Sequence, residues 1–319
     1  MPTVAVVGRG VVGQRITRRL PTVADGITLI EHDPRRGRDL PDDVAVAVLA
    51  HGSAHADLAR WLVDRGVAVV SVGADLADVR SMLDLDDLAR AAGVPLVVGA
   101  GMDPGLTGLL ARLAASALTS CDELHVSIHG TAGPACARRH HRALSGRALG
   151  FHDGEWIQPT AGSGRELCWF PEPVGPYDCY RAELASPLLL QHSFPEADRI
   201  SARVSANRRD RFTAWLPMLS PPHREGGVGA VRVEVRGTDE SGARVTSIVG
   251  IAELVATATA ATASAFAVEA LRGHLPGGVS RAGDAALDTA GILRTVSQLG
   301  VRLQEFTGVP STQRIRANP

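Results

Sequence analysis

The chain has 319 residues, of which 45% are hydrophobic and 21% are charged, so two folded domains are expected. Its 33 basic residues nearly balance its 34 acidic residues, which argues against the strong basic field that nucleic-acid or acidic-membrane partners need. All the basic residues are arginine. This excludes a catalytic lysine and favours two parallel hydrogen bonds wherever a cation meets a carboxylate or phosphate.

Cysteine spacing and the N-terminus bear on the class of protein. The cysteines at 121, 136, 168 and 179 lack the spacing of a zinc site or a Cys-x-x-Cys pair, so we interpret them as structural thiols and expect no metal. The N-terminus enters an apolar strand without the features of a secretory signal. We therefore expect a cytoplasmic protein that acts on a small molecule and has neither a nucleic-acid nor a membrane partner.

A glycine turn follows the first expected strand, which covers residues 3–7, and leads into a helix that ends near residue 20. Gly8 permits the turn, Gly10 leaves room for a pyrophosphate, and Gly13 lets the helix lie close to the strand. The free N–H groups at the helix start would bind the phosphate oxygens. The pattern predicts a dinucleotide site that comprises Gly8, Arg9, Gly10, Val11, Val12 and Gly13.

The second expected strand, 27–30, determines the cofactor preference. It is followed by Glu31, at the position where a carboxylate accepts hydrogen bonds from the adenosine ribose hydroxyls. This favours NAD slightly. The cofactor set also includes His32, and the arginines of segment 35–38 keep NADP open because one of them could pair with a 2′-phosphate.

Alternation of strands and helices continues through the first 120 residues. Strands are expected over 44–49, 67–70 and 95–98, and helices over about 53–65, capped by Ser53, and 82–92. Repeated strand–helix units predict an α/β fold with an N-terminal Rossmann domain over 1–120, built on a doubly wound parallel sheet. Ligands bind at the carboxyl ends of such strands, so the expected cofactor contacts include His51, Gly52, Gly73, Ala74, Gly101 and Met102.

Segment 99–111 combines glycines with Pro104 immediately before an expected helix, whose N-terminus provides a positive dipole end near the nicotinamide. If the dinucleotide carries a nicotinamide, the reaction is a hydride transfer, which needs orientation of the reactants and one acid–base group. With lysine absent, the candidates for this catalytic role are Asp103, Tyr177, Asp178 and the histidines. Asp103 has the best expected position, and its alternative role is to cap the helix that follows.

Three features together resemble the saccharopine dehydrogenase-like family. They are the G-x-G-x-x-G turn, the run GMDPGLTGLLA over 101–111, and PYDCY over 176–180. The resemblance covers nearly the whole chain, including the Thr/Ala-rich helix expected over 255–271. It implies an NAD(P)-dependent dehydrogenase or reductase that acts on a C–N bond of an amino-acid-derived imine or secondary amine in amino-acid metabolism. It also places residues 102–105 beside the reacting centre.

The second half predicts a different architecture. Strands over 124–128, 200–205, 229–236 and 243–254, with long loops between them, indicate an α+β substrate and dimerisation domain over 121–319. Its C-terminal helices are placed to pack back on the Rossmann domain, and we expect a homodimer. Segment 159–176 is interpreted either as a loop that covers the cleft or as a surface connection.

The expected substrate carries carboxylates, so basic side chains in this half are candidates to bind it. The substrate set is Asp103, Pro104, Gly105, His129, Arg138 and Arg139. The two arginines belong to a basic cluster that continues through His140, His141 and Arg142, and the arginines at 181, 208, 209 and 211 are a second cationic group. Two other functions stay open. The chain could be a non-catalytic dinucleotide-binding sensor, since no catalytic dyad is evident, or an enoyl reductase that acts on a carrier-bound chain.

Overall fold

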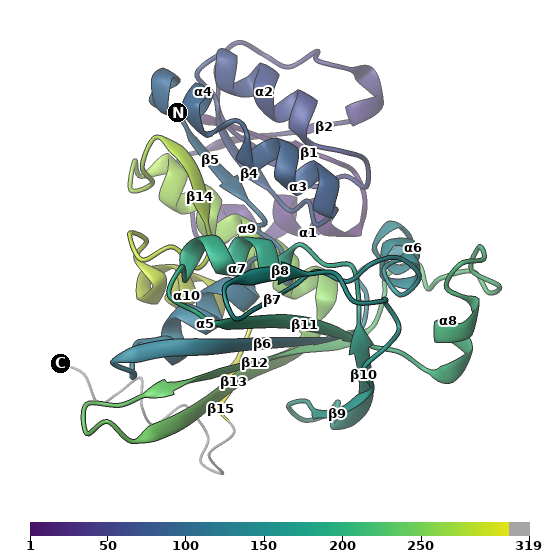
Figure 1. Cartoon of the computed structure of the whole chain (residues 1–319). Coiled ribbons are helices and arrows are strands. Elements are labelled where there is room, and N and C mark those ends of the chain that lie inside the picture. Colours follow the sequence, from purple (N-terminus) through teal and green to yellow (C-terminus); the bar gives the residue numbers. More distant parts are fainter. Residues whose placement is uncertain (306–319) are drawn as a thin grey trace.

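The computed structural model describes residues 1–305, which form two β-sheets with helices packed around and between them (Figure 1). The first sheet has six parallel strands in the order β14-β5-β4-β3-β1-β2. They are β1 (Thr3–Val7), β2 (Thr28–His32), β3 (Val44–Leu49), β4 (Ala68–Ser71), β5 (Pro95–Val98) and β14 (Gly278–Arg281).

Helices cover both faces of this sheet. In β1, Val4 and Val6 join one buried cluster and Ala5 and Val7 join another, because successive strand residues point to opposite faces. A strand that is apolar on both faces is typical of a buried parallel sheet. The surrounding helices are α1 (Val11–Arg19), α2 (Ala56–Asp64), α3 (Leu76–Leu83), α4 (Asp86–Ala92) and α9 (Val255–Leu271), with short 3-10 turns at Leu20–Thr22 and Pro34–Arg36.

The second sheet is mixed and has nine strands, seven of them in the order β15-β13-β12-β6-β11-β10-β9. Its strands are β6 (Ser120–His129), β7 (Gly150–His152), β8 (Glu155–Ile157), β9 (Glu166–Trp169), β10 (Pro176–Arg181), β11 (Arg199–Ser205), β12 (Val228–Thr238), β13 (Arg244–Leu254) and β15 (Leu303–Glu305). Its helices are α5 (Leu106–Ala115), α6 (Pro134–Arg142), α7 (Ser186–Ser193), α8 (Arg208–Thr213) and α10 (Thr289–Gln298). Together the two sheets confirm the predicted fold class.

Helix α9 lies between the two halves of the molecule. It packs against β3 and β4 of the first sheet, against α1 and α10, and against β12 and β13. Its Ala, Thr and Ser side chains are almost all buried, and their small size permits close approach on every side. No helix in residues 1–305 is both long and apolar enough to cross a membrane.

Some expected elements differ from those observed. One helix was expected over 82–92, but the segment forms two helices, α3 and α4. Helix α3 begins earlier than expected because Asp75 caps it, accepting hydrogen bonds from the backbone N–H groups of Ala77 and Asp78. Segment 159–176 is not wholly irregular, since it contains β9, which pairs with β10. The expectation that Ser53 caps the next helix is also wrong. That helix begins at Ala56, and the Asp78 carboxylate accepts hydrogen bonds from the backbone N–H groups of His55 and Ala56 at its start.

Candidate functional site

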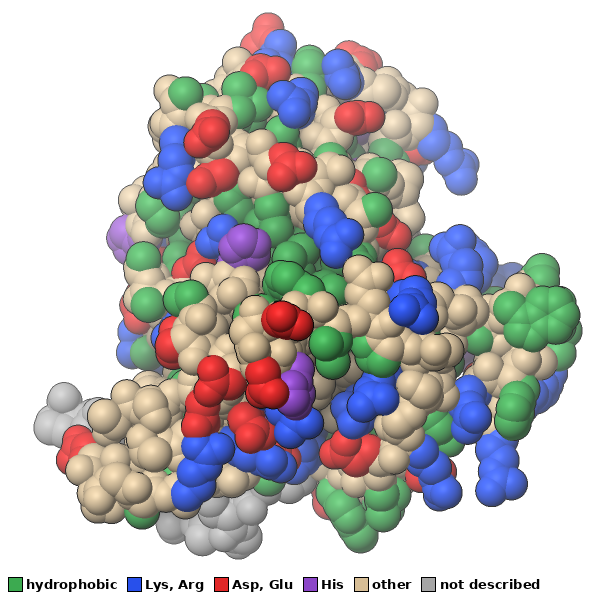
Figure 2. Space-filling view, in the orientation of Figure 1, with side chains coloured by type: hydrophobic (Ala, Val, Ile, Leu, Met, Phe, Trp, Pro, Cys, Tyr) green, Lys and Arg blue, Asp and Glu red, His purple; other side chains and the backbone are tan. Residues whose placement is uncertain are grey.

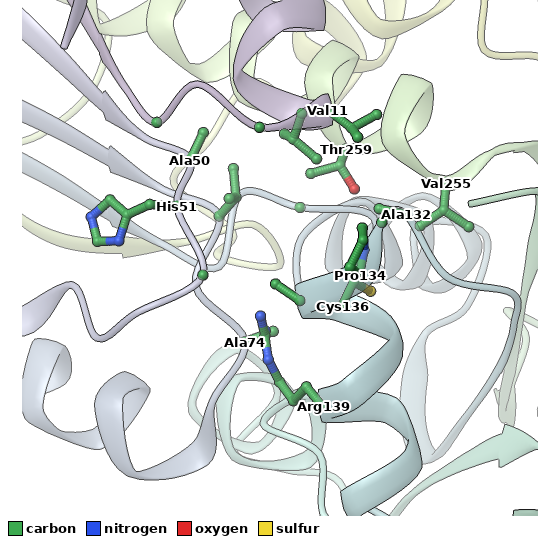
Figure 3. Close-up of a pocket in the computed structure, with 18 of the residues that line it drawn as sticks. Val11, Ala50, His51, Ala74, Ala132, Pro134, Cys136, Arg139, Val255 and Thr259 are labelled. Atoms are coloured by element: carbon green, nitrogen blue, oxygen red, sulfur yellow. The ribbon is translucent and has the colours of Figure 1, made fainter. Parts of the chain in front are cut away.

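A pocket of about 730 Å³ lies between the carboxyl ends of the first sheet's strands and helix α6 (Figure 3). One wall consists of the turn after β1, the loop after β3, the loop after β4 and the loop after β5. The other wall is α6, from Pro134 to His140, and α9 contributes Val255 and Thr259. Ligand sites of open parallel sheets lie in this position, outside the carboxyl ends of the strands.

The glycines of the first turn have different structural roles. Gly8 has φ of +133°, and a Cβ there would lie 2.4 Å from the Ala50 carbonyl oxygen. A Cβ at Gly13 would lie 1.8 Å from the Gly8 carbonyl oxygen, so this glycine is required where α1 passes the turn. A Cβ at Gly10 would meet no atom of the described chain within 4 Å, and Gly10 lines the pocket. The space in front of Gly10 therefore belongs to the pocket.

The loop after β5 holds a partly buried aspartate, Asp103, at the pocket. Asp103 Oδ1 accepts hydrogen bonds from Ser186 Oγ at 2.6 Å and from Thr107 Oγ1 at 2.9 Å. Burial raises the pKa of the Asp103 carboxyl to about 6, against the opposing effect of these two hydrogen bonds. Both protonation states are therefore accessible near neutral pH, which suits a group that exchanges a proton with a ligand.

The position of Met102, beside Asp103 in this loop, is fixed by a helix distant in sequence. The Met102 backbone N–H donates to Thr259 Oγ1 of α9 at 3.2 Å. The loop closes on itself through the hydrogen bond from Gly101 N–H to the Pro104 carbonyl oxygen at 2.8 Å. Gly105 has φ of +136°, and a Cβ there would lie 2.3 Å from the Gly101 carbonyl oxygen. The glycines thus hold the backbone beneath Asp103 in a compact turn.

Two histidines lie at the loop after β3. His55 is fully buried, with Nδ1 2.7 Å from Ser71 Oγ, and burial lowers its pKa to about 3, so its ring stays neutral. His51 lines the pocket, its ring lies 4.1 Å from that of His55, and burial lowers its pKa as well. His51 Nδ1 is 2.8 Å from Ser53 Oγ. Its Nε2 is buried and has no hydrogen-bond partner among residues 1–305.

Helix α6 supplies the cationic side of the pocket. Arg139 extends from α6 toward Ala74 in the loop after β4 (Figure 3), and it forms no ion pair within residues 1–305. His140 also lines the pocket, with Nε2 3.2 Å from the Ser205 carbonyl oxygen, and burial lowers its pKa. The pocket therefore combines an unpaired guanidinium with a neutral histidine.

The structure brings twelve of the expected site residues to the pocket lining. These are Gly8, Arg9, Gly10, Val11, Val12, His51, Gly52, Ala74, Gly101, Met102, Asp103 and Arg139.

The remaining candidates lie elsewhere. Four of them lie in or next to the loops around the pocket but do not line it: Gly13, Gly73, Pro104 and Gly105. Glu31 does not line it either, and its Oε2 lies 4.0 Å from Nε of the lining residue Arg9. The buried His32 bonds the Gly37 carbonyl oxygen. Arg138 is exposed. Two candidates lie on the second sheet. His129 Nδ1 is 2.8 Å from Ser205 Oγ, and the His129 ring contacts that of Tyr177, with 4.1 Å between their centroids. Tyr177 does not line the pocket and so is not brought together with Asp103 there.

Several lining residues were not expected from the sequence. The 3-10 turn after β2 contributes Asp33, together with Arg35, which was expected as a possible partner of a 2′-phosphate. Helix α6 contributes Cys136, and the segment after β10 contributes Glu183. A signal for α6 was present, because Gly133-Pro134 is a typical helix start with proline at the first helical position. The approach of Glu183 depends on how the second sheet folds back, and local sequence carries no sign of it.

Comparison with known proteins shows a similar fold in solved structures. No family model and no curated protein matches the chain. Saccharopine dehydrogenase (L-Glu forming) from Saccharomyces cerevisiae superposes with a TM-score of 0.67 over 96% of this chain and 100% of that chain, at 12% identity. A meso-dapdh mutant from Clostridium tetani E88 gives a TM-score of 0.50 at 13% identity, with 100% of both chains covered. The chain thus shares its fold with these dehydrogenases.

Proposed function

We propose that this chain is an NAD(P)-dependent oxidoreductase that transfers hydride to or from an amino-acid-derived imine or secondary amine carrying carboxylate groups. One observation carries the proposal: the glycine turn and Asp103 line the same pocket, which Arg139 faces from α6. The similar fold of the saccharopine and meso-dapdh enzymes supports it.

The pocket residues fit a dinucleotide. The open space at Gly10 admits a pyrophosphate, and the free N–H groups at the start of α1 point toward it. The loop after β5 would lie beside the nicotinamide, because this loop occupies the carboxyl end of the neighbouring strands. When bound, the cofactor supplies the hydride donor or acceptor. We propose NAD as the slightly preferred form.

The remaining chemistry falls to two side chains of the protein. Asp103, whose pKa lies near 6, would donate a proton to the substrate nitrogen during reduction and accept it during oxidation. Arg139 would hold a substrate carboxylate through two parallel hydrogen bonds and so fix the carbon that receives the hydride. Both groups act on one pocket, from opposite walls.

The test combines binding and turnover. Calorimetry should show that the purified chain binds NADH or NADPH. A screen of amino acids paired with keto acids should show that at least one pair is reduced, with oxidation of NADH or NADPH. Turnover of a substrate without a carboxylate only, such as an enoyl thioester, would overturn the substrate class. Tight binding of a dinucleotide with no turnover of any pair would favour the sensor function, and absence of dinucleotide binding would overturn the whole proposal.

A further inference from the structure

Eight arginines lie on two packed segments, residues 134–147 and 206–225, and one of them, Arg139, lines the pocket. They are Arg138, Arg139, Arg142, Arg147, Arg208, Arg209, Arg211 and Arg224, and none forms an ion pair within residues 1–305. The only carboxylates of the two segments are Asp210 and Glu225, and Glu225 pairs with Arg15. The chain's near-neutral charge, from which no membrane partner was expected, conceals this local concentration.

Large apolar side chains lie exposed within the second segment. Phe212 is 66% exposed, Trp215 75% and Leu219 61%. The Trp215 indole N–H donates to the Phe212 carbonyl oxygen at 3.1 Å, so the exposed part of this side chain is apolar. Figure 2 shows hydrophobic side chains beside basic ones at the right edge of the molecule, where α8 projects in Figure 1. We call segments 134–147 and 206–225 the arginine–aromatic surface.

The two segments are fastened to each other and to the body of the protein. His141 Nε2 of α6 lies 3.0 Å from the Thr213 carbonyl oxygen and 3.2 Å from that of Leu216. The Arg211 guanidinium lies over the ring of the buried Tyr180, 5.2 Å from its centroid. The surface therefore presents arginines and apolar side chains in a fixed arrangement, beside the pocket that α6 lines.

We propose that the arginine–aromatic surface docks on an anionic lipid bilayer. Unpaired arginines complement the negative headgroups, and Phe, Trp and Leu side chains insert at the boundary between headgroups and acyl chains. A phosphate backbone of nucleic acid would match the arginines but would leave Leu219 exposed. A second copy of the chain fits poorly, because a two-fold contact would set the same arginines against one another. The surface would hold the pocket rim of α6 near the bilayer.

The test is sedimentation of the full chain with vesicles. We expect binding to vesicles of phosphatidylcholine mixed with phosphatidylserine, weak binding to phosphatidylcholine alone, and release by high salt because screening weakens the arginine contacts. The R208Q/R209Q variant should bind the anionic vesicles about thirtyfold more weakly. Neither arginine lines the pocket, so binding of NADH should be unchanged and would show that the variant is folded.

A tryptophan variant tests the apolar part of the surface. Trp215→Ser should reduce vesicle binding and should remove a blue shift of the fluorescence that vesicles induce in the unmodified chain. Trp169→Ser is the matched control, since Trp169 is 59% exposed on β9, outside the arginine–aromatic surface. R60Q/R80Q is the control for charge, because both arginines are exposed and lie on α2 and α3.

Several outcomes would overturn the proposal. These are equal binding to neutral and anionic vesicles, no binding to either, or an equal loss in the control variants. Stronger binding to a single-stranded oligonucleotide than to anionic vesicles would point to nucleic acid instead. A dimer that Trp215→Ser dissociates in size-exclusion chromatography would assign the surface to a second copy. None of these measurements depends on turnover, so the proposal can fail independently of the proposed function.

Discussion

The two walls of the pocket offer a ligand different kinds of contact. The wall formed by the first sheet is built largely from backbone and small residues, with Gly10 facing open space and the N–H groups of α1 behind it. The α6 wall offers side chains, above all Arg139 and His140. Backbone groups suit a feature common to every dinucleotide, whereas side chains can select among substrates. This difference separates cofactor binding from substrate choice, and each of the following changes should affect one without the other.

The largest effect on cofactor affinity is expected at the backbone wall. Gly10→Val should weaken binding of NADH and NADPH about a hundredfold or more, because the side chain fills the pyrophosphate space and removes several charge-assisted hydrogen bonds. Its melting temperature should stay near that of the unmodified chain, since a Cβ there meets no neighbour within residues 1–305. Gly13→Ala is the contrasting variant and should lower the melting temperature, because its Cβ would lie 1.8 Å from the Gly8 carbonyl oxygen. Unchanged cofactor affinity in Gly10→Val would remove this turn from the cofactor site.

Asp103→Asn should affect the proton transfer and leave cofactor affinity unchanged. Loss of a general acid–base group lowers kcat by about a hundred- to ten-thousandfold. Because the pKa of Asp103 lies near 6, oxidation of the amine should speed up as pH rises through about 6, when the carboxylate becomes the base. Reduction should slow over the same range, since the protonated acid is lost.

Ser186→Ala sharpens this test of Asp103. Ser186 donates a hydrogen bond that favours the charged carboxylate, so its removal should raise the pKa of Asp103 and move the inflection of the rate profile to higher pH. A profile that is the same in the unmodified chain and in Asp103→Asn would assign the proton to another group.

The third prediction concerns the α6 wall. Arg139→Ala should raise KM for a carboxylate substrate about ten- to hundredfold, because a bidentate charge-assisted pair contributes about 1.5 to 3 kcal/mol. Affinity for NADH should not change. Arg138→Ala is the matched control, since its side chain is exposed on the same helix and does not line the pocket. An equal rise of KM in both variants would indicate a general effect of charge at α6.

The backbone wall was easier to predict from sequence than the α6 wall, for a physical reason. Strand–glycine–helix order fixes where Gly8, Gly10 and Gly13 lie relative to one another, and the carboxyl ends of parallel strands meet at one edge of a sheet. Hence His51, Ala74 and Met102 could be placed near the turn although they are distant in sequence. Each of the three lines the pocket.

The α6 wall depends on contacts between distant segments. Arg138 and Arg139 were both candidates to touch substrate. Because they are consecutive residues of α6, their side chains point in different directions, and the packing of α6 places Arg139 at the pocket and Arg138 in solvent. Tyr177 was an alternative to Asp103 as the acid–base group, and it does not line the pocket. Its place on β10, against His129, follows from strand pairing that no local pattern specifies.

The smallest expected effect is at the edge of the backbone wall, where the two cofactors differ. Glu31→Ala should weaken NADH binding about three- to tenfold and NADPH binding less. The reason is that only NADH keeps the free ribose 2′-hydroxyl that would donate a hydrogen bond to the carboxylate. The effect is small because Glu31 lies 4.0 Å from Arg9 Nε and does not itself line the pocket.

Arg35 does line the pocket and is the contrasting residue. Arg35→Ala should weaken NADPH more than NADH if this guanidinium meets a 2′-phosphate. Calorimetry with both cofactors on both variants measures the two preferences together, and a greater loss of NADPH than NADH in Glu31→Ala would reverse the proposed preference for NAD.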